Sequence, residues 1–312
     1  MATDLIVTDP LEPSAEAIDR AAALIRRGGI VAIPTDTLYT LVCDPLSLKA
    51  VGRIFAAKGR PADHPLIVHI ASAEHLPHWA SSVPTTAAVL ADACWPGPLT
   101  VLVPKADHVL PVVTGGRPTV GVRVPAHPLT LELLERFGGG LAAPSANRFG
   151  KVSPTTAEHV RADLGDLVDY VLDGGPCPVG VESTIVDCTV TPAQILRPGG
   201  IPDEQIAALL RDDVAPATGP SRASGMLASH YAPTARVLLA DSADEARQLA
   251  AAHPGSEVLD RTDDLVDSAR HLYDDLRDAD RRGVSVVVAV MPPALGLGHA
   301  IRDRLTKAAA AG

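Results

Sequence analysis

Several sequence patterns that mark common enzyme classes are absent from the 312 residues. No Gly-x-Gly-x-x-Gly follows the first predicted strand, and Gly150-Lys151 lacks both the earlier Gly and the adjacent Ser or Thr of a P-loop. The chain also has no His-Glu-x-x-His pattern and no Gly-x-Ser-x-Gly nucleophile elbow. The sequence therefore disfavours an ordinary dinucleotide enzyme, a P-loop ATPase, a zinc site and an acyl hydrolase.

Cysteine, aromatic residues and positive net charge are scarce as well. Cys43, Cys94, Cys177 and Cys188 lie far apart, without a close pair for metal or redox chemistry, so we expect buried, reduced thiols. Aromatic residues make up 3% of the chain and its net charge is -10. Both values oppose a general nucleic-acid-binding surface, which needs cations for the phosphates and rings for stacking.

Long apolar runs are also missing. The sequence contains no transmembrane stretch, and its start, Met-Ala-Thr-Asp-Leu, lacks a basic region followed by a long apolar run. We therefore expect a cytoplasmic protein that does not contact the membrane.

The cations that are present gather in one part of the sequence. Between Lys49 and Lys151 there are ten Lys and Arg against six Asp and Glu, in a chain that is acidic elsewhere. A bound phosphate is expected in this region. Arg outnumbers Lys by 22 to five, so a single Arg is weak evidence for a site.

Length and an apolar content of 46% predict two domains. Alternating strands and helices indicate an α/β catalytic domain at 1–211, and the stretch 212–235 is dense in Pro, Ala, Gly and Ser, as in a linker. Residues 236–312 predict a small α/β domain. This second domain has few candidate chemical residues, so we expect it to act as a lid or in assembly.

One strand-helix-strand unit collects polar groups. A strand at 30–33 leads into Thr-Asp-Thr, a helix from about Ser47 stops at Gly59, and a strand at 66–70 follows. Ligands of α/β proteins bind at such strand ends. The unit gathers Thr35, Asp36, Thr37, Lys58, Arg60 and His69.

A later strand, 120–124, alternates so that its valines share one face and Arg123 lies on the other. Taken alone, this strand allows two interpretations: a site arginine, or an exposed arginine on an edge strand. Pro144-Ser-Ala-Asn147 follows a third predicted strand, 141–143, again at a strand end.

Eight short motifs in order resemble the YrdC-type threonylcarbamoyl-AMP synthases, over roughly residues 14–203. They are Pro34-Thr-Asp-Thr-Leu-Tyr39, Lys58-Gly-Arg-Pro61, Pro65-Leu-Ile-Val-His69, Trp95-Pro-Gly-Pro-Leu-Thr100, Val122-Arg-Val-Pro125, Pro144-Ser-Ala-Asn147, Glu182-Ser-Thr184 and Arg197-Pro-Gly199. Ser224-Gly-Met226 and His230-Tyr-Ala-Pro233 resemble the linker of the longer, two-domain members. The resemblance implies an α/β fold, with a twisted mixed sheet and flanking helices followed by a small Rossmann-like domain.

The resemblance also implies a reaction. L-threonine, bicarbonate or CO2, and ATP with Mg²⁺ would give threonylcarbamoyl-AMP and pyrophosphate. A partner enzyme, a tRNA threonylcarbamoyl transferase, would then modify an adenosine beside the tRNA anticodon, so that tRNA is met only indirectly. Because three anionic reactants must meet, the protein mainly positions groups and neutralises charge, and no protein nucleophile is required.

By the same resemblance, Arg123 binds the threonine carboxylate through two parallel charged hydrogen bonds. The other residues implied for the threonine pocket are Thr37, His69, Ala143 and Ser183. The residues implied for ATP are Lys58, Arg60, His64, Thr119, Ser145, Asn147, Ser153, Arg197 and Tyr231, with Lys58 and Arg60 also catalytic and no residue assigned to a metal.

Two positions depart from the family pattern, and other functions stay open. Thr40 replaces the usual Gly, so its side chain could crowd the pocket or oppose a positive φ, and His64 replaces the usual Asn. One alternative function is a non-catalytic RNA-binding module. Another is carbamoyl-AMP chemistry with a different acceptor.

Overall fold

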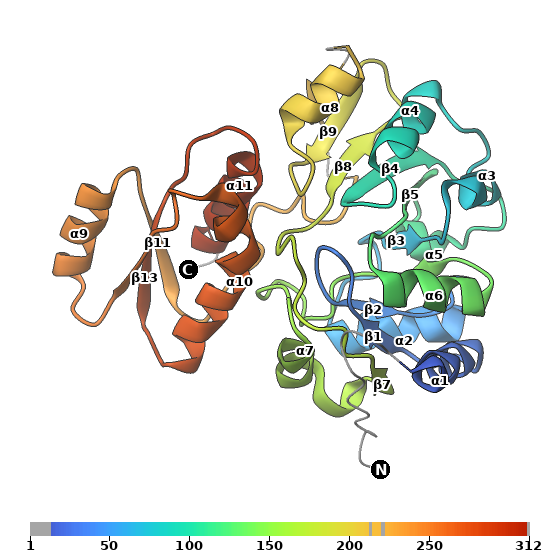
Figure 1. Cartoon of the computed structure of the whole chain (residues 1–312), viewed down its shortest axis with the longest axis horizontal. Helices are drawn as coiled ribbons and strands as arrows, with labels where there is room; N and C mark the ends of the chain where they lie inside the picture. The colour runs from blue at the N-terminus through green and yellow to red at the C-terminus, as the bar shows by residue number, and fades with distance from the viewer. Residues whose placement is uncertain (1–13, 212–213, 220–221, 311–312) are drawn as a thin grey trace.

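Two parts of the chain fold into separate α/β layers in the computed structural model, which describes residues 14–211, 214–219 and 222–310 (Figure 1). The first domain contains a seven-stranded mixed sheet with the order β10-β9-β8-β4-β5-β3-β6 and a three-stranded sheet with the order β2-β1-β7. The strands are β1 (Val31–Ile33), β2 (Thr40–Val42), β3 (Ile67–His69), β4 (Leu99–Pro104), β5 (Thr119–Arg123), β6 (Leu141–Ala142), β7 (Tyr170–Val171), β8 (Thr184–Asp187), β9 (Ala193–Arg197) and β10 (Val214–Pro216).

Helices flank these sheets and complete the twisted mixed α/β architecture predicted for the first domain (Figure 1). They are α1 (Ala15–Arg26), α2 (Leu48–Lys58), α3 (Leu76–Trp79), α4 (Thr85–Cys94), α5 (Pro111–Thr114), α6 (Pro128–Phe137), α7 (Ala157–Leu164) and α8 (Asp203–Leu209), with short 3₁₀ turns at Ala73–His75 and Gly165–Leu167. In the described ranges, no helix combines the length and apolar character needed to cross a lipid bilayer.

Helix α2 shows how local sequence sets up the site. It begins at Ser47, whose hydroxyl accepts a hydrogen bond from the backbone N–H of Ala50. It ends at Gly59, which adopts φ 64°, the left-handed conformation that glycine tolerates best. This ending places Lys58 and Arg60 together. Val51 and Ile54 of this helix are buried, whereas Leu48 in its first turn is 67% exposed.

The second domain is a parallel three-stranded sheet with helices on both faces, which confirms its Rossmann-like prediction. Its strands are β11 (Arg236–Ala240), β12 (Glu257–Leu259) and β13 (Val286–Val290), in the order β11-β13-β12. Helix α9 (Ala243–Ala252) lies on the side away from the first domain, whereas α10 (Leu265–Arg281) and α11 (Gly298–Ala309) lie between the small sheet and the first domain (Figure 1).

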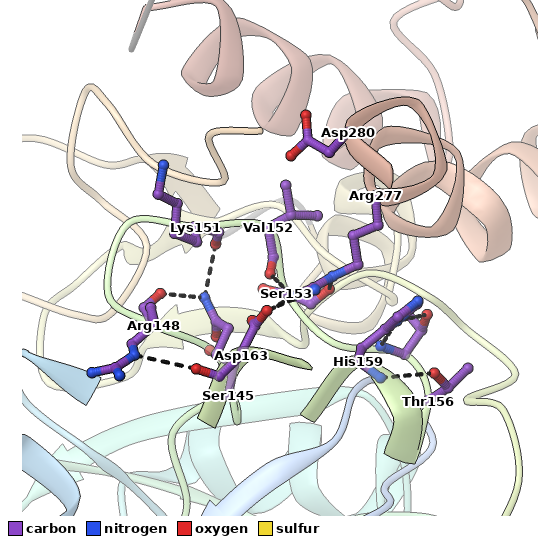
Figure 2. A network of polar contacts seen from close by, with 12 residues as sticks. Ser145, Arg148, Lys151, Val152, Ser153, Thr156, His159, Asp163, Arg277 and Asp280 are labelled. Carbon is purple, nitrogen blue, oxygen red and sulfur yellow. Dashed lines mark hydrogen bonds and ion pairs between the residues drawn. The ribbon is translucent and has the colours of Figure 1, made fainter. Parts of the chain in front are cut away.

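Arg277 of α10 joins the two domains. Its guanidinium donates two hydrogen bonds to the Asp163 carboxylate of α7, at 2.9 and 2.6 Å, and further bonds to the carbonyls of Val152 and Ser153 (Figure 2). Asp280 on the same helix accepts bonds from the backbone N–H groups of residues 234 and 235. Helix α10 is therefore bonded both to the first domain and to the end of the linker.

The strands differ from the prediction in two ways. β1 and β3, which we expected in one strand-helix-strand unit of a single sheet, lie in separate sheets, because β1 pairs with β2 and β7 instead. The three residues of β10 fall inside the predicted linker, yet they pair in parallel with β9 and so extend the larger sheet.

Candidate active site

A hollow of about 570 Å³, part of it open to solvent, lies where the first domain meets the linker. Its wall is made by Thr37, Leu38, Thr40, Arg60, Ile67, His69, Arg123, Ala143, Pro144, Ser145, Glu182, Ser183, Arg197, Ser224, Gly225, His230 and Tyr231.

All five residues predicted for threonine line this hollow. They come from five separate segments: Thr37 follows β1, His69 ends β3, Arg123 ends β5, Ala143 follows β6 and Ser183 precedes β8. His69 and Arg123 are register partners in adjacent parallel strands. Their side chains therefore project from the same face of the sheet, next to each other.

Arg123 is 3% exposed, so its interpretation as an exposed edge-strand arginine was wrong. Strand β5 lies between β4 and β3, not at an edge. The guanidinium donates to Gly97 O at 3.0 Å, to Thr37 Oγ1 at 2.8 Å and to Asp36 Oδ1 at 2.5 Å. Burial lowers the pKa of Arg123, whereas Asp36 raises it. Each terminal nitrogen makes one of these bonds, so each has a second N–H to offer.

His69 is fully buried, and neither ring nitrogen has a hydrogen-bond partner among the described residues. Burial, and then the neighbouring Arg123, lower the pKa of His69 well below its usual value. The imidazole is therefore neutral, with one N–H donor and one free acceptor. Such a group is costly to bury unless a ligand satisfies it.

Thr40 also lines the hollow, and its hydroxyl is buried without a partner among the described residues. Its backbone does not have a positive φ, because it pairs in β2 with Ile33. The expected backbone conflict is therefore absent, and crowding of the pocket by the Thr40 side chain stays a prediction.

Two more arginines, both predicted to bind the nucleotide, line the hollow. Arg60 donates to Pro65 O and to Ser224 Oγ, both at 2.9 Å. Arg197 donates to Ser183 O at 3.1 and 2.9 Å, which orients it across the wall. Burial lowers the pKa of Arg60 to about 10, so this group remains a cation at neutral pH. Three guanidinium groups, those at 60, 123 and 197, therefore face one hollow.

Lys58 does not form part of the wall. Its ammonium group is buried and donates to the carbonyl oxygens of Ser145 and of Asn147, the latter at 2.6 Å. Burial, and then Arg60, lower the pKa of Lys58 well below its usual value. In this conformation Lys58 fixes the loop that carries Ser145, which does line the hollow, and its catalytic role stays a prediction.

Four other predicted nucleotide residues also lie outside the wall. Ser153 donates its hydroxyl to Glu182 at 2.7 Å, and Asn147 donates its amide to the carbonyls of residues 148 and 151. His64 packs edge-on against Phe149, with ring centroids 5.1 Å apart. Thr119 begins β5, at the end opposite Arg123, about 13 Å away along the strand. The side-chain groups of Ser153 and Asn147 are thus already used by the protein.

Glu182 belongs to the wall but was not predicted as a site residue. It is 7% exposed and accepts hydrogen bonds from Ser153 at 2.7 Å, from the Tyr273 hydroxyl at 2.8 Å and from Arg304 Nε at 2.7 Å. Burial alone would raise the pKa of Glu182, but the charges of Arg304 and Arg197 lower it to about 2. Sequence reasoning missed it because two of its partners are 91 and 122 residues away.

Tyr231 lines the hollow from the linker, as predicted for the nucleotide side. It has φ 60°, which is uncommon for a residue with a side chain. Its ring stacks on Tyr273 with centroids 5.7 Å apart, and His230 meets it edge-on at 4.2 Å. The Tyr231 hydroxyl is buried and has no partner among the described residues.

Comparison with known proteins agrees with this geometry. The sequence model of a family described as "Telomere recombination" matches residues 23–199, and that of the threonylcarbamoyl-AMP synthase C-terminal domain matches residues 201–310. The threonylcarbamoyl-AMP synthase of Pyrococcus abyssi is 43% identical over 92% of both chains, and that of Bacillus subtilis is 39% identical over 97% of this chain and 96% of its own.

A solved structure is similar over nearly the whole length. The crystal structure of P. abyssi Sua5 complexed with L-threonine matches with a TM-score of 0.93 and 39% identity, covering 98% of each chain. These matches include both domains and favour an enzyme over a non-catalytic RNA-binding module. The chain therefore belongs to the two-domain threonylcarbamoyl-AMP synthase family of enzymes.

Proposed function

We propose that this chain joins L-threonine, bicarbonate or CO2, and ATP into threonylcarbamoyl-AMP and pyrophosphate, for threonylcarbamoyladenosine modification of tRNA beside the anticodon. One observation carries the proposal: five threonine-side residues from separate segments converge on a hollow that Arg60 and Arg197 also line. The similar P. abyssi protein was solved with L-threonine, which supports the amino-acid half of the assignment.

The reaction depends more on how the protein positions its reactants than on a reactive side chain of the protein. The threonine nitrogen bonds to the carbon of CO2 with loss of a proton, or to the carbon of bicarbonate with loss of water, and either step gives a carbamate. A carbamate oxygen then bonds to the α-phosphorus of ATP, and the bond from that phosphorus to the bridging oxygen breaks, so that pyrophosphate leaves with the electron pair. Every reactant is anionic or becomes so, and fixed cations stabilise the charge that moves onto the leaving group.

The residues divide this work between two sides of the hollow. On the threonine side, the free N–H groups of Arg123 fit a carboxylate, and the unpartnered His69 nitrogens fit the threonine amine or hydroxyl. On the other side, Arg60 and Arg197 fit phosphate oxygens. Ser145 and Tyr231 lie in the wall for the rest of the nucleotide.

Magnesium would enter with ATP. In the described residues no group of three or more His, Cys, Asp and Glu could hold a metal ion. Phosphate oxygens and water are the usual ligands of nucleotide-bound Mg²⁺, and the ion supplies charge neutralisation on the phosphates. The donor set therefore fits a metal that ATP carries, with Arg60 and Arg197 sharing the phosphate charge.

The product is a mixed anhydride of a carbamic and a phosphoric acid, which transfers its acyl group readily. We propose that a tRNA threonylcarbamoyl transferase consumes it, so that this chain meets tRNA only through that partner.

Pyrophosphate release tests the proposed function. With ATP and Mg²⁺ present, release should require both L-threonine and bicarbonate, and mass spectrometry should find the threonylcarbamoyl adenylate. Arg197→Met should slow release, whereas the matched Arg247→Met, on a side chain 72% exposed in α9, should not. Release that is indifferent to threonine would overturn the proposal.

A further inference from the structure

A buried carboxylate in the wall of the hollow is held by residues of the second domain. Glu182 precedes β8 of the first domain and lines the hollow. Its Oε2 accepts hydrogen bonds from Tyr273 of α10 at 2.8 Å and from Arg304 of α11 at 2.7 Å. Ser153 of the first domain binds the other oxygen at 2.7 Å. Residues of the second domain thus hold a side chain in the wall of the candidate active site.

The same arginine contacts the linker. The Arg304 guanidinium lies 5.1 Å from the centroid of the Tyr231 ring, and Tyr273 stacks on that ring at 5.7 Å. A left-handed backbone at a tyrosine persists only where the surroundings hold it. Lys307, one turn along α11, donates to Gly225 O at 2.6 Å and fixes a second point of the linker. Residues of α10 and α11 therefore hold the linker against the hollow.

Charge makes the contact between Arg304 and Glu182 matter for the ligand. An ionised carboxylate in the wall would repel the phosphates of ATP, and it would also compete for Arg197. Arg304 is 1% exposed, so its attraction to Glu182 is weakly screened by solvent. Because the positive charge of Arg304 balances the negative charge of ionised Glu182, the guanidinium groups of Arg60 and Arg197 remain available to an anion.

We propose that Arg304 is a positioning residue for the active site, supplied by the second domain, which neutralises Glu182 and holds Tyr231 at the nucleotide side of the hollow. The inference rests on the proposed function. ATP binding then depends on the second domain. Threonine binding does not, because its five candidate residues all belong to the first domain.

Arg304→Met tests this separation of the two substrates. We expect the KM for ATP, and the Kd of a non-hydrolysable ATP analogue measured by calorimetry, to rise about tenfold or more. The KM for threonine should stay within about threefold. The matched control is Arg302→Met on the same helix, whose side chain donates to Pro292 O at 2.9 Å outside the hollow. This control should leave both values unchanged.

A second substitution separates electrostatics from damage to the fold. If an unpaired Glu182 causes the loss, Glu182→Gln added to Arg304→Met should recover about threefold or more of the lost ATP affinity. General destabilisation would instead lower the Tm and the active fraction without changing either KM, and the second substitution would not reverse it. Should Arg304→Met fail to fold, Tyr273→Phe, which removes only a hydroxyl, should give the same selective change with smaller size.

The outcomes are distinct. An ATP-selective effect with partial recovery supports the proposal. Equal changes for both substrates, no change in KM, or no recovery in the double variant overturns it. Wild-type protein without threonine-dependent pyrophosphate release would contradict the proposed function instead, and analogue binding by the variants would still measure the role of Arg304.

Discussion

Arg123→Ala removes a cation that serves both the fold and the proposed threonine site. Losing a hydrogen bond to a charged partner costs about 1.5 to 3 kcal/mol. At 1.4 kcal/mol per factor of ten, the Kd for L-threonine should rise roughly 10-fold to 150-fold. The substitution also leaves Asp36, which is 4% exposed, as a buried carboxylate without its cation. Breaking such a pair costs about 3 to 5 kcal/mol of folding free energy.

The double variant Arg123→Ala with Asp36→Asn separates these two effects. A neutral amide tolerates burial better than an unpaired carboxylate and still accepts the bond from the backbone N–H of Ala126. Urea unfolding should therefore show partial recovery of stability, while calorimetry with L-threonine should still show weak binding. Arg136→Ala, which removes two surface ion pairs, with Asp19 and with Glu132, is the control and should change both values little. If the double variant binds threonine within about threefold of the wild type, the reasoning is refuted.

Three further predictions concern pH, the loop behind the hollow and the metal. His69 is held neutral in the folded protein, so at pH values below its ordinary pKa of 6.5 only the unfolded chain gains this proton. The free energy of unfolding should therefore fall as the pH is lowered from about 7 to 5. In urea unfolding, His69→Gln should make the free energy of unfolding depend less on pH. Lys58→Met leaves the carbonyls of Ser145 and Asn147 without their donor, so unfolding free energy should drop by about 1 to 3 kcal/mol and kcat at least about tenfold; unchanged kinetics would contradict its proposed role. EDTA should stop pyrophosphate release but leave threonine binding by calorimetry intact; release that persists would exclude the need for Mg²⁺.

Local sequence predicted the elements well where one pattern decides them. Helix α2 begins after Ser47 and ends at Gly59, as predicted, and residues 236–310 contain the strands and helices of the predicted small α/β domain. Pairing between strands was harder, because it depends on contacts between distant segments. Nothing local shows that β1 pairs with β7, or that residues 214–216 extend the larger sheet.

For the site as well, local motifs predicted some features, and contacts between distant segments decided the others. The resemblance placed Arg123 and the other threonine-side residues, and these side chains do meet in one hollow. The nucleotide-side prediction was less complete: Ser153 and Asn147 already bond to the protein, and Glu182 was missed. Which polar groups are already satisfied depends on partners such as Arg304, 122 residues from Glu182, and no motif records such a pairing.

The central claim is that one hollow holds an amino acid and a nucleotide together. A crystal structure with both L-threonine and a non-hydrolysable ATP analogue tests it most directly. We predict the threonine carboxylate on Arg123, its amine directed at the α-phosphorus, and phosphate oxygens on Arg60 and Arg197. Threonine bound elsewhere, or a nucleotide whose α-phosphate lies away from the threonine amine, would contradict the account.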